Sequence, residues 1–351
     1  MLFLMQLAVN KGKGRLMNVM SVLVIRCGAL GDLICSTSVI DAVKRQFGES
    51  TVIDYVCSPG PGSLFSLDHR VNKVYGLKHG KVPVWLSTDK RKIVRTSKET
   101  AYDILINFGS GKQFKSLVDS IHAKTKVGFH CGKIDIPGGL HMVEGLKCVL
   151  RGLIDEDNLT KAAPSIMGSP VAAMKEKYGL KDRYIVLSPS NSHHSRNTMN
   201  HRAWRDDHWV ELMHMLSEDV QVVLVGSRGE ERFFNALKPY PASVVDLVGK
   251  TSLADLIGVV DGARGLISTD TGTAHMASAT NTDVFALIGP TPAHETGPYQ
   301  SPINTVHIIS KHLPCSPCYK TEVMSNCQDN RCMTEISAID VYDRVKSSCL
   351  V

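Results

Sequence analysis

The chain has 351 residues, of which 43% are hydrophobic and 21% are charged, and its formal net charge is +6. This composition is ordinary for a globular protein of about two domains. The mild charge gives no indication of a nucleic-acid partner, and no apolar run is long enough to span a bilayer.

The N-terminal segment is apolar from Met1 to Val9, and Lys11, Lys13 and Arg15 follow it. A secretory signal carries its positive charge before the apolar segment, so this order argues against a signal peptide. Met17 and Met20 immediately precede a predicted strand, so residues 1–20 could be a disordered extension or the result of a wrongly assigned start. We expect the protein to be cytoplasmic. In that reducing compartment the ten cysteines would not form a disulfide framework.

Short apolar runs alternate with helix-like stretches in the first half of the chain. A helix is predicted from Leu33 to Phe47, where apolar residues recur at helical spacing. The predicted strands of this half are Val22–Cys27, Val52–Val56, Val71–Leu77, Ile104–Ile106 and Lys126–Phe129.

The periodicity is interrupted between Leu159 and Lys181 by Pro164, Gly168 and Pro170, and then the alternation restarts. We therefore predict two domains, residues 1–168 and 169–351. The second includes a helix from Asp206 to Leu216, and Val284–Ile288 is expected to be its last strand. The other strands predicted there are Tyr184–Ser188, Gln221–Val225, Val244–Val245 and Leu266–Ile267.

Strands that alternate with helices imply parallel sheets with right-handed crossovers. The predicted fold class is therefore α/β, with two doubly wound, Rossmann-like domains facing a central cleft. Ligands of such sheets bind beyond the carboxyl ends of the strands.

The most informative stretch is Gly265–Ala279, which reads as a strand end, a polar turn and a helix start. This order presents free backbone N–H groups and the positive end of a helix dipole to an anion such as phosphate. Thr271 can cap the helix, Gly272 lets a ligand approach the backbone, and His275 lies on the first turn. The alternative is a well-capped helix without a ligand.

In the first half, Gly28–Asp32 is a glycine-containing turn that ends in a carboxylate. It matches the dinucleotide-binding fingerprint only loosely, and no acidic residue ends the second strand, which disfavours a nicotinamide enzyme. Asp32 is predicted to face the cleft from the start of a helix, either as a functional carboxylate or as a helix N-cap.

Two other strand ends of the second half also carry polar residues. Ser190 and Asn191 open a long polar loop that leads to Arg202. Arg202 could clamp a phosphate or be a solvated loop charge. Glu230 and Glu231 could accept hydrogen bonds from a ribose or simply occupy the first turn of a helix.

These motifs, in this order, resemble glycosyltransferase family 9, the ADP-heptose:lipopolysaccharide heptosyltransferases. The resemblance extends from about Val22 to Val345. The segments that carry it are Val24–Leu33, Arg202–Trp204 before His208–Trp209, Gly226 with Glu230, Asp270–His275, and Gly289–Thr291. It implies a GT-B enzyme that is inverting and independent of metal, with no cofactor.

By this resemblance, Asp32 is the general base that deprotonates the acceptor hydroxyl. Arg202 would contact the donor phosphates, Glu230 would contact the ribose, and the turn that starts at Asp270 would hold the diphosphate. The implied donor-binding set is Ser190, Asn191, Arg202, Glu230, Asp270, Thr271, Gly272, Thr273 and His275.

The resemblance also implies the partners: a nucleotide-diphosphate sugar such as ADP-heptose, and an anionic glycolipid acceptor at the inner face of the cytoplasmic membrane. Arg205 stands where the family usually has proline. Two alternatives to this function stay open. The chain could be another nucleotide-sugar GT-B transferase, or it could be a catalytically silent sugar-nucleotide-binding module.

Two further clusters have open interpretations. Cys315, Cys318, Cys327 and Cys332 could form a structural zinc site, or be free or conditionally oxidised thiols. Five basic residues between Lys90 and Lys98 could be a solvated face, or could attract an anionic glycolipid and the inner leaflet.

Overall fold

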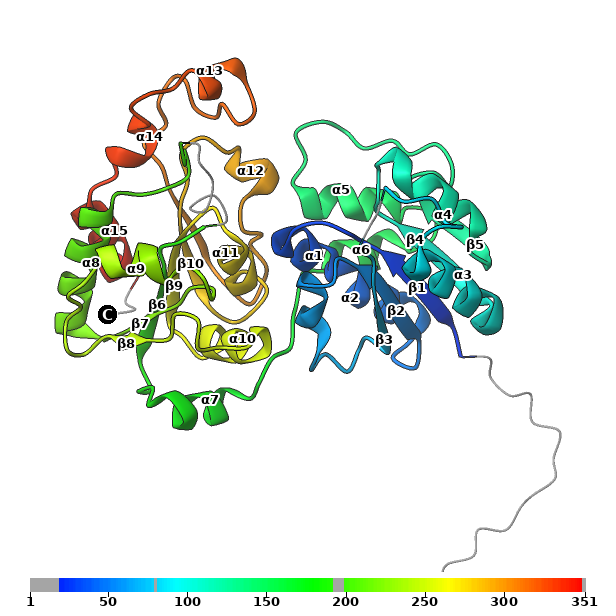
Figure 1. The fold of residues 1–351 in the computed structure, drawn as a ribbon, viewed down its shortest axis with the longest axis horizontal. Helices are drawn as coiled ribbons and strands as arrows, with labels where there is room; N and C mark the ends of the chain where they lie inside the picture. The colour runs from blue at the N-terminus through cyan, green and yellow to red at the C-terminus, as the bar shows by residue number, and fades with distance from the viewer. Residues whose placement is uncertain (1–18, 79–80, 192–198, 349–351) are drawn as a thin grey trace, which may run out of the picture.

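The computed structural model describes residues 19–78, 81–191 and 199–348. Most of the expected N-terminal extension, residues 1–18, lies outside this range, as does part of the polar loop before Arg202. The chain forms two α/β halves that lie side by side (Figure 1). None of the described helices is long and apolar enough to cross a membrane.

The first half contains a five-stranded sheet with the order β3-β2-β1-β4-β5 among the described residues, and its strand pairs are parallel. Its strands are β1 (Ser21–Ile25), β2 (Val52–Cys57), β3 (Lys73–Gly76), β4 (Tyr102–Asn107) and β5 (Ala123–Gly128). Its helices are α1 (Leu30–Ser36), α2 (Ser38–Phe47), α3 (Thr88–Thr100), α4 (Lys115–Ser120), α5 (Met142–Val149) and α6 (Glu156–Lys161), with 3-10 turns η1 (Pro61–Phe65) and η2 (Lys112–Phe114).

Strand β1 lies at the centre of this sheet and is apolar on both faces. Val22 and Val24 pack with residues of α1, α2 and α5, whereas Leu23 and Ile25 pack with residues of α3 and α4. All four side chains are fully buried. Alternate residues of a strand point to opposite faces, so a continuous apolar run is what a sheet covered on both sides requires.

The single helix expected over Leu33–Phe47 is wrong, because α1 ends at Ser36 and α2 begins at Ser38. Three consecutive hydroxyl groups lie at this junction. The side chains of Ser36, Thr37 and Ser38 each donate to a main-chain carbonyl three residues earlier, at 2.7, 2.7 and 2.9 Å. Such bonds compete with the helical pattern and favour a break.

The second half contains a six-stranded parallel sheet with the order β11-β10-β9-β6-β7-β8 among the described residues. Its strands are β6 (Tyr184–Ser188), β7 (Gln221–Leu224), β8 (Val245–Asp246), β9 (Gly265–Thr269), β10 (Asp283–Leu287) and β11 (Val306–Ile309). The expectation that β10 would be the last strand is wrong. Strand β11 adds an edge strand, and its partial exposure weakens the apolar pattern that predicts strands.

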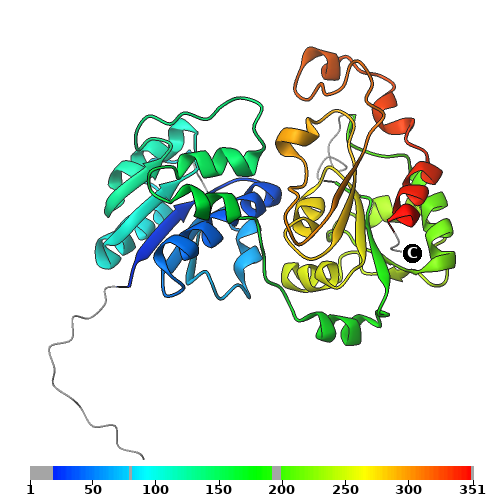
Figure 2. The same ribbon diagram turned by 180° about the vertical axis from the view of Figure 1, so that it is seen from behind.

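Helices cover both faces of the second sheet (Figures 1 and 2). In β9, Leu266 packs with residues of α10 and α11, whereas Ile267 packs with residues of α8 and α15. The helices of this half are α7 (Val171–Tyr178), α8 (Asp206–Asp219), α9 (Glu231–Ala236), α10 (Leu253–Asp261), α11 (Gly272–Ala277), α12 (Ala293–Thr296), α13 (Glu322–Ser325), α14 (Arg331–Thr334) and α15 (Ala338–Ser347).

A connecting segment, residues 162–170, joins the two halves. Ser165 is held by the first half, where Arg70 Nη1 donates to its hydroxyl at 2.6 Å. Ser169 is held by the second half, where its hydroxyl donates to Asp255 at 2.7 Å. We propose that the domain boundary between residues 168 and 169 falls in this segment.

Candidate active site

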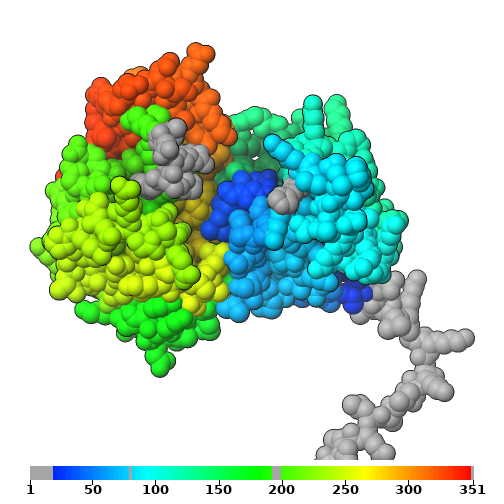
Figure 3. All heavy atoms as spheres, in the orientation of Figure 1, coloured from blue at the N-terminus to red at the C-terminus, as the bar shows by residue number. Residues whose placement is uncertain are grey.

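A cavity of about 940 Å³ lies between the two halves. Figure 3 shows the blue residues of the first half meeting the yellow residues of the second half along the same face of the molecule. All ten residues predicted to form the site line this cavity: Asp32, Ser190, Asn191, Arg202, Glu230, Asp270, Thr271, Gly272, Thr273 and His275. The parallel strands of each sheet end at this cleft, which is why residues far apart in the sequence meet there.

Asp32 lies in the first turn of α1, at the cavity wall that the first half supplies. The alternative that it is the helix N-cap is wrong, because Ala29 occupies that position. Asp32 stands three residues later, and its Oδ2 accepts the backbone N–H of Ala29 at 3.2 Å. This is the reverse half of a capping box, and the other carboxylate oxygen remains available for further partners.

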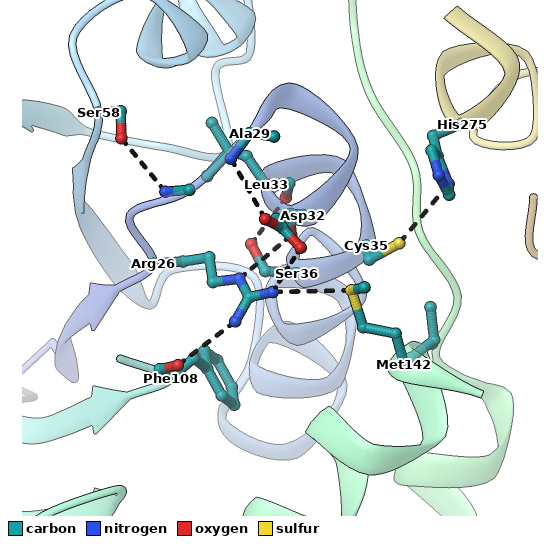
Figure 4. A network of polar contacts seen from close by, with 12 residues as sticks. Arg26, Ala29, Asp32, Leu33, Cys35, Ser36, Ser58, Phe108, Met142 and His275 are labelled. Carbon is teal, nitrogen blue, oxygen red and sulfur yellow. Dashed lines mark hydrogen bonds and ion pairs between the residues drawn. The ribbon is translucent and has the colours of Figure 1, made fainter. Parts of the chain in front are cut away.

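That second oxygen binds Arg26, at the end of β1. Arg26 Nη2 donates to Asp32 Oδ1 at 3.0 Å, and Arg26 Nη1 donates to the carbonyl of Phe108 at 3.3 Å (Figure 4). The Arg26 side chain is 16% exposed and that of Asp32 is 33% exposed. A nearly buried guanidinium therefore holds a carboxylate that remains open to the cavity.

The opposite wall is the turn between β9 and α11. Thr271 is the N-cap of α11, and its Oγ1 accepts the N–H of Ala274 at 3.3 Å, as the sequence predicts. Ser268 bonds to the same hydroxyl at 2.9 Å. The first turn of α11, which carries the free N–H groups, therefore lies at the cavity wall beside the carboxylate of Asp270.

The two walls are held together by α1 packing against α11. A Cβ atom on Gly31 would lie 2.6 Å from Cδ2 of His275, and one on Gly272 would lie 3.3 Å from Leu30. Neither glycine has a positive φ, so their contribution here is the space left by the missing side chain. The close approach of the two helices therefore depends on Gly31.

His275 is buried at this contact, with 8% of its surface exposed. Its Nδ1 lies 3.9 Å from the thiol of Cys35 (Figure 4). Burial lowers the pKa of His275 below the usual imidazole value, although the nearby Asp270 and Asp32 carboxylates act in the opposite direction. Burial at this contact therefore favours a neutral imidazole.

Arg202 is not the solvated loop charge of the alternative interpretation. Its Nη1 lies 3.3 Å from Oδ2 of Asp270, and these side chains are 18% and 10% exposed. The guanidinium also stacks on the ring of Tyr319, with 4.7 Å between its carbon and the ring centroid. These contacts fix a cation beside the α11 turn, where it can contact an anionic ligand.

Glu230 is the N-cap residue of α9, so it precedes the first helical turn. Its Oε2 accepts from the hydroxyl of Ser190 at 2.7 Å and from the N–H of Ser227 at 2.7 Å. Asn191 accepts a hydrogen bond from the side chain of Asn200 at 2.9 Å. This arrangement links the ends of β6 and β7 and leaves polar groups at the cavity wall.

Tyr319 and Lys320 are among the cavity-lining residues that the sequence prediction missed. They follow Cys318 directly, and Lys320 Nζ lies 5.0 Å from the centroid of the Tyr319 ring. Lys320 has a positive φ of 62°. The sequence carries no periodic or motif signal that the chain comes back to the cavity at these residues. Its one unusual feature here is that Tyr-Lys interrupts a segment rich in Cys and Pro.

The four C-terminal cysteines are free thiols in the structure, with Cys318 and Cys332 buried. Burial raises the pKa of Cys332 to about 11, and the neighbouring thiols act in the same direction. Among the described residues, no group of three or more His, Cys, Asp or Glu side chains is arranged to hold a metal ion.

The model of glycosyltransferase family 9 (heptosyltransferase) matches residues 91–328. The chain belongs to this family. Lipopolysaccharide heptosyltransferase 3 of Escherichia coli strain K12 is 24% identical over 290 residues, covering 74% of this chain and 80% of that protein. The heptosyltransferase OpsX of Haemophilus influenzae is 20% identical over 346 residues, covering 93% and 96%.

Solved structures of the same family share the fold. A family 9 glycosyltransferase from Veillonella parvula superposes with a TM-score of 0.76 at 15% identity, covering 93% of this chain and 96% of that one. ADP-heptose heptosyltransferase II of E. coli gives 0.73 at 19%, covering 93% and 98%. E. coli WaaC with ADP gives 0.66 at 19%, covering 93% and 99%.

The predicted fold class is confirmed: this family 9 chain has the GT-B architecture of two Rossmann-like halves. It is a glycosyltransferase of the heptosyltransferase family, which acts in lipopolysaccharide biosynthesis. The roles of the individual site residues are proposed below.

Proposed function

We propose that this chain transfers heptose, or a related sugar, from an ADP-sugar to a lipopolysaccharide core or another lipid-linked saccharide, with inversion and without a metal ion. One observation carries this proposal. A carboxylate from the first half and a polar helix start from the second half line opposite walls of one cavity. An inverting transferase needs this arrangement, because the base and the leaving group act on opposite faces of the anomeric carbon.

The second half supplies the donor-binding groups. The free N–H groups of the first turn of α11, with Thr271 and Thr273, bind the diphosphate, and Arg202 adds a positive charge. Glu230 and Ser190 accept hydrogen bonds from the ribose hydroxyl groups. The ADP bound to WaaC and the ADP-heptose named for heptosyltransferase II support an ADP-sugar as the donor.

Asp32 acts as the general base. The acceptor hydroxyl attacks the anomeric carbon while its proton passes to Asp32, and the bond from that carbon to the diphosphate oxygen breaks. ADP leaves with the electron pair of this bond, stabilised by the α11 turn and Arg202. Arg26 fixes the orientation of the carboxylate through its hydrogen bond to Oδ1. General base catalysis contributes about 10²- to 10⁴-fold, and positioning supplies much of the remainder.

The acceptor is proposed to be an anionic glycolipid that the enzyme meets at the inner face of the cytoplasmic membrane, through a peripheral contact. The basic residues of α3 support this proposal, because their charge complements the negative headgroups of an anionic lipid surface.

The test is to incubate the purified chain with ADP-heptose and truncated core oligosaccharides, with UDP-glucose as the control donor. Mass spectrometry should find one added heptose, and proton NMR of the product should show the inverted anomeric configuration. Transfer from UDP-glucose but not from ADP-heptose would identify another GT-B transferase. Tight ADP-heptose binding without transfer to any acceptor would indicate a silent binding module and overturn the proposal.

A further inference from the structure

An exposed apolar pair stands at the start of the most basic helix of the first half. Trp85 is 71% exposed and Leu86 is 56% exposed. The other two tryptophans of the chain, Trp204 and Trp209, are 2% and 0% exposed. A large apolar side chain left this open next to a second one is costly in water and typical of a contact surface.

The turn that carries this pair is well ordered by its neighbours. Backbone N–H groups of Leu86 and Ser87 donate to the carbonyl of Pro83 at 3.2 and 3.1 Å. Ser87 is the buried N-cap of α3 and accepts the N–H of Lys90 at 3.2 Å. Val84 packs against the core beneath the turn. Because the flanking residues are anchored inward, Trp85 and Leu86 are held outward.

The helix that follows presents positive charge to solvent. Residues 88–100 contain five Lys or Arg and two Asp or Glu. Lys90 is buried, whereas the other four cations are exposed: Arg91, Lys92, Arg95 and Lys98. Arg91, Arg95 and Lys98 recur at spacings of four and three, so they share one face of α3.

This surface lies at the edge of the sheet from which Asp32 projects. Leu77 follows the carboxyl end of β3, and the β1–α1 turn follows the carboxyl end of β1 in the same parallel sheet. The first turn of α3 is held at this edge, because the backbone N–H of Lys78, just after β3, donates to Oδ2 of Asp89 at 3.1 Å. A lipid surface that bound at Trp85 would therefore present the molecules anchored in it near Asp32, the proposed base.

We propose that Trp85, Leu86 and the exposed cations of α3 form the surface by which the first half docks on an anionic lipid bilayer. Tryptophan favours the boundary between headgroups and acyl chains, and the cations bind the negative headgroups. This inference rests on the proposed function, since it orients the cleft toward a membrane-anchored acceptor.

The three tryptophans make the experiment direct. The full chain is mixed with vesicles of phosphatidylcholine alone, or of phosphatidylcholine with phosphatidylglycerol, at low salt. Only Trp85 is open to lipid, so a blue shift of the fluorescence and quenching by brominated acyl chains report its insertion. We expect both with the anionic vesicles, and we expect both to weaken as salt rises.

Co-sedimentation with the vesicles provides the second readout, for variants that lack the fluorophore. Trp85→Ser with Leu86→Ser, and Arg91→Glu with Lys92→Glu and Arg95→Glu, should each weaken vesicle binding by at least about tenfold. The matched control is Ile339→Ser, which removes an apolar side chain that is 49% exposed on α15. It should bind vesicles like the unaltered chain.

Two readouts separate this proposal from the proposed function. Affinity for ADP-heptose and turnover with a water-soluble core oligosaccharide should be unchanged in both surface variants. If those quantities fall while vesicle binding persists, the surface binds the acceptor saccharide and the proposal is wrong. Equal vesicle binding by all the variants would also overturn it, whatever sugar the enzyme transfers.

Discussion

Arg26 Nη2 lies 3.0 Å from Asp32 Oδ1, so the carboxylate proposed as the base is held by a guanidinium at the end of the adjoining strand. The remaining oxygen, Oδ2, accepts the N–H of Ala29 at 3.2 Å. Both contacts come from the same β1–α1 turn. The carboxylate is therefore oriented before any ligand binds, and binding does not have to order it.

The first prediction tests Asp32 as a base. Asp32→Asn keeps one side-chain oxygen for Ala29 but cannot accept a proton from a hydroxyl. We expect turnover to fall by about 10² or more. ADP-heptose affinity should stay the same, because the donor groups lie on the other wall. The lost ion pair is partly exposed and should cost about 1 kcal/mol or less, measured by thermal unfolding.

The matched control for Asp32 is Asp41→Asn on α2. Asp41 also pairs with an arginine, Arg45, at 2.9 Å, and its side chain is 27% exposed. It does not line the cavity, so its loss should leave turnover intact. If Asp32→Asn turns over as fast as Asp41→Asn with a genuine acceptor, Asp32 is not the base.

The second prediction concerns the contact between the two halves. Gly31→Ala places a Cβ atom 2.6 Å from His275 and should push α1 away from α11. Displacing the base from the donor site should lower kcat/KM by about 10- to 100-fold. The control is Gly145→Ala in α5, whose nearest atom, on Ile136, lies at an ordinary 3.5 Å.

Alanine favours helices over glycine by up to about 1 kcal/mol, so Gly145→Ala should unfold at the same or a higher temperature. Gly31→Ala lacks this benefit because of the steric conflict. Steady-state kinetics and thermal unfolding of the pair measure both effects. Equal kcat/KM for the two variants would show that the α1–α11 contact does not position the site.

The third prediction is that the affinity for ADP-heptose depends on pH. Burial lowers the pKa of His275 below the usual imidazole value. A bound diphosphate stabilises the imidazolium and raises that pKa. The charged and titratable groups near His275 are Asp270, Asp32, Arg202, His141 and Cys35.

The direction in which affinity changes with pH follows from the linkage between proton binding and ligand binding. A group whose pKa is higher in the complex adds affinity that is fully present below the free-state pKa and is lost as pH rises through the bound-state pKa. Affinity for ADP-heptose should therefore fall across this interval, which begins below the usual imidazole value. Isothermal titration calorimetry across this range measures it, and the diester diphosphate of ADP-heptose avoids a titrating terminal phosphate.

His275→Ala should flatten this profile. His294→Ala is the control, because His294 is 66% exposed and lies outside the cavity. It should preserve the decline of affinity with pH. An unchanged profile in His275→Ala would show that His275 does not bind the diphosphate and has only a packing role.

Local patterns in the sequence were sufficient for the alternation of strands and helices, and together with the family resemblance they identified ten of the residues that line the cavity. Parallel strands end at a common edge, so polar residues after β1, β6, β7 and β9 must gather at the cleft once the alternation is recognised. Thr271 could be identified as a cap because capping involves only residues three positions apart. These features depend on chemistry that is close in the sequence.

Only the tertiary structure revealed features that depend on distant neighbours. Strand β11 is half exposed and is defined by its pairing with β10. Tyr319 reaches the cavity only because the C-terminal segment folds back onto Arg202, more than a hundred residues earlier. The need for glycine at position 31 arises from His275 in the other half. Contacts between segments so far apart leave no periodic pattern in either segment, because each is set by the packing of the other.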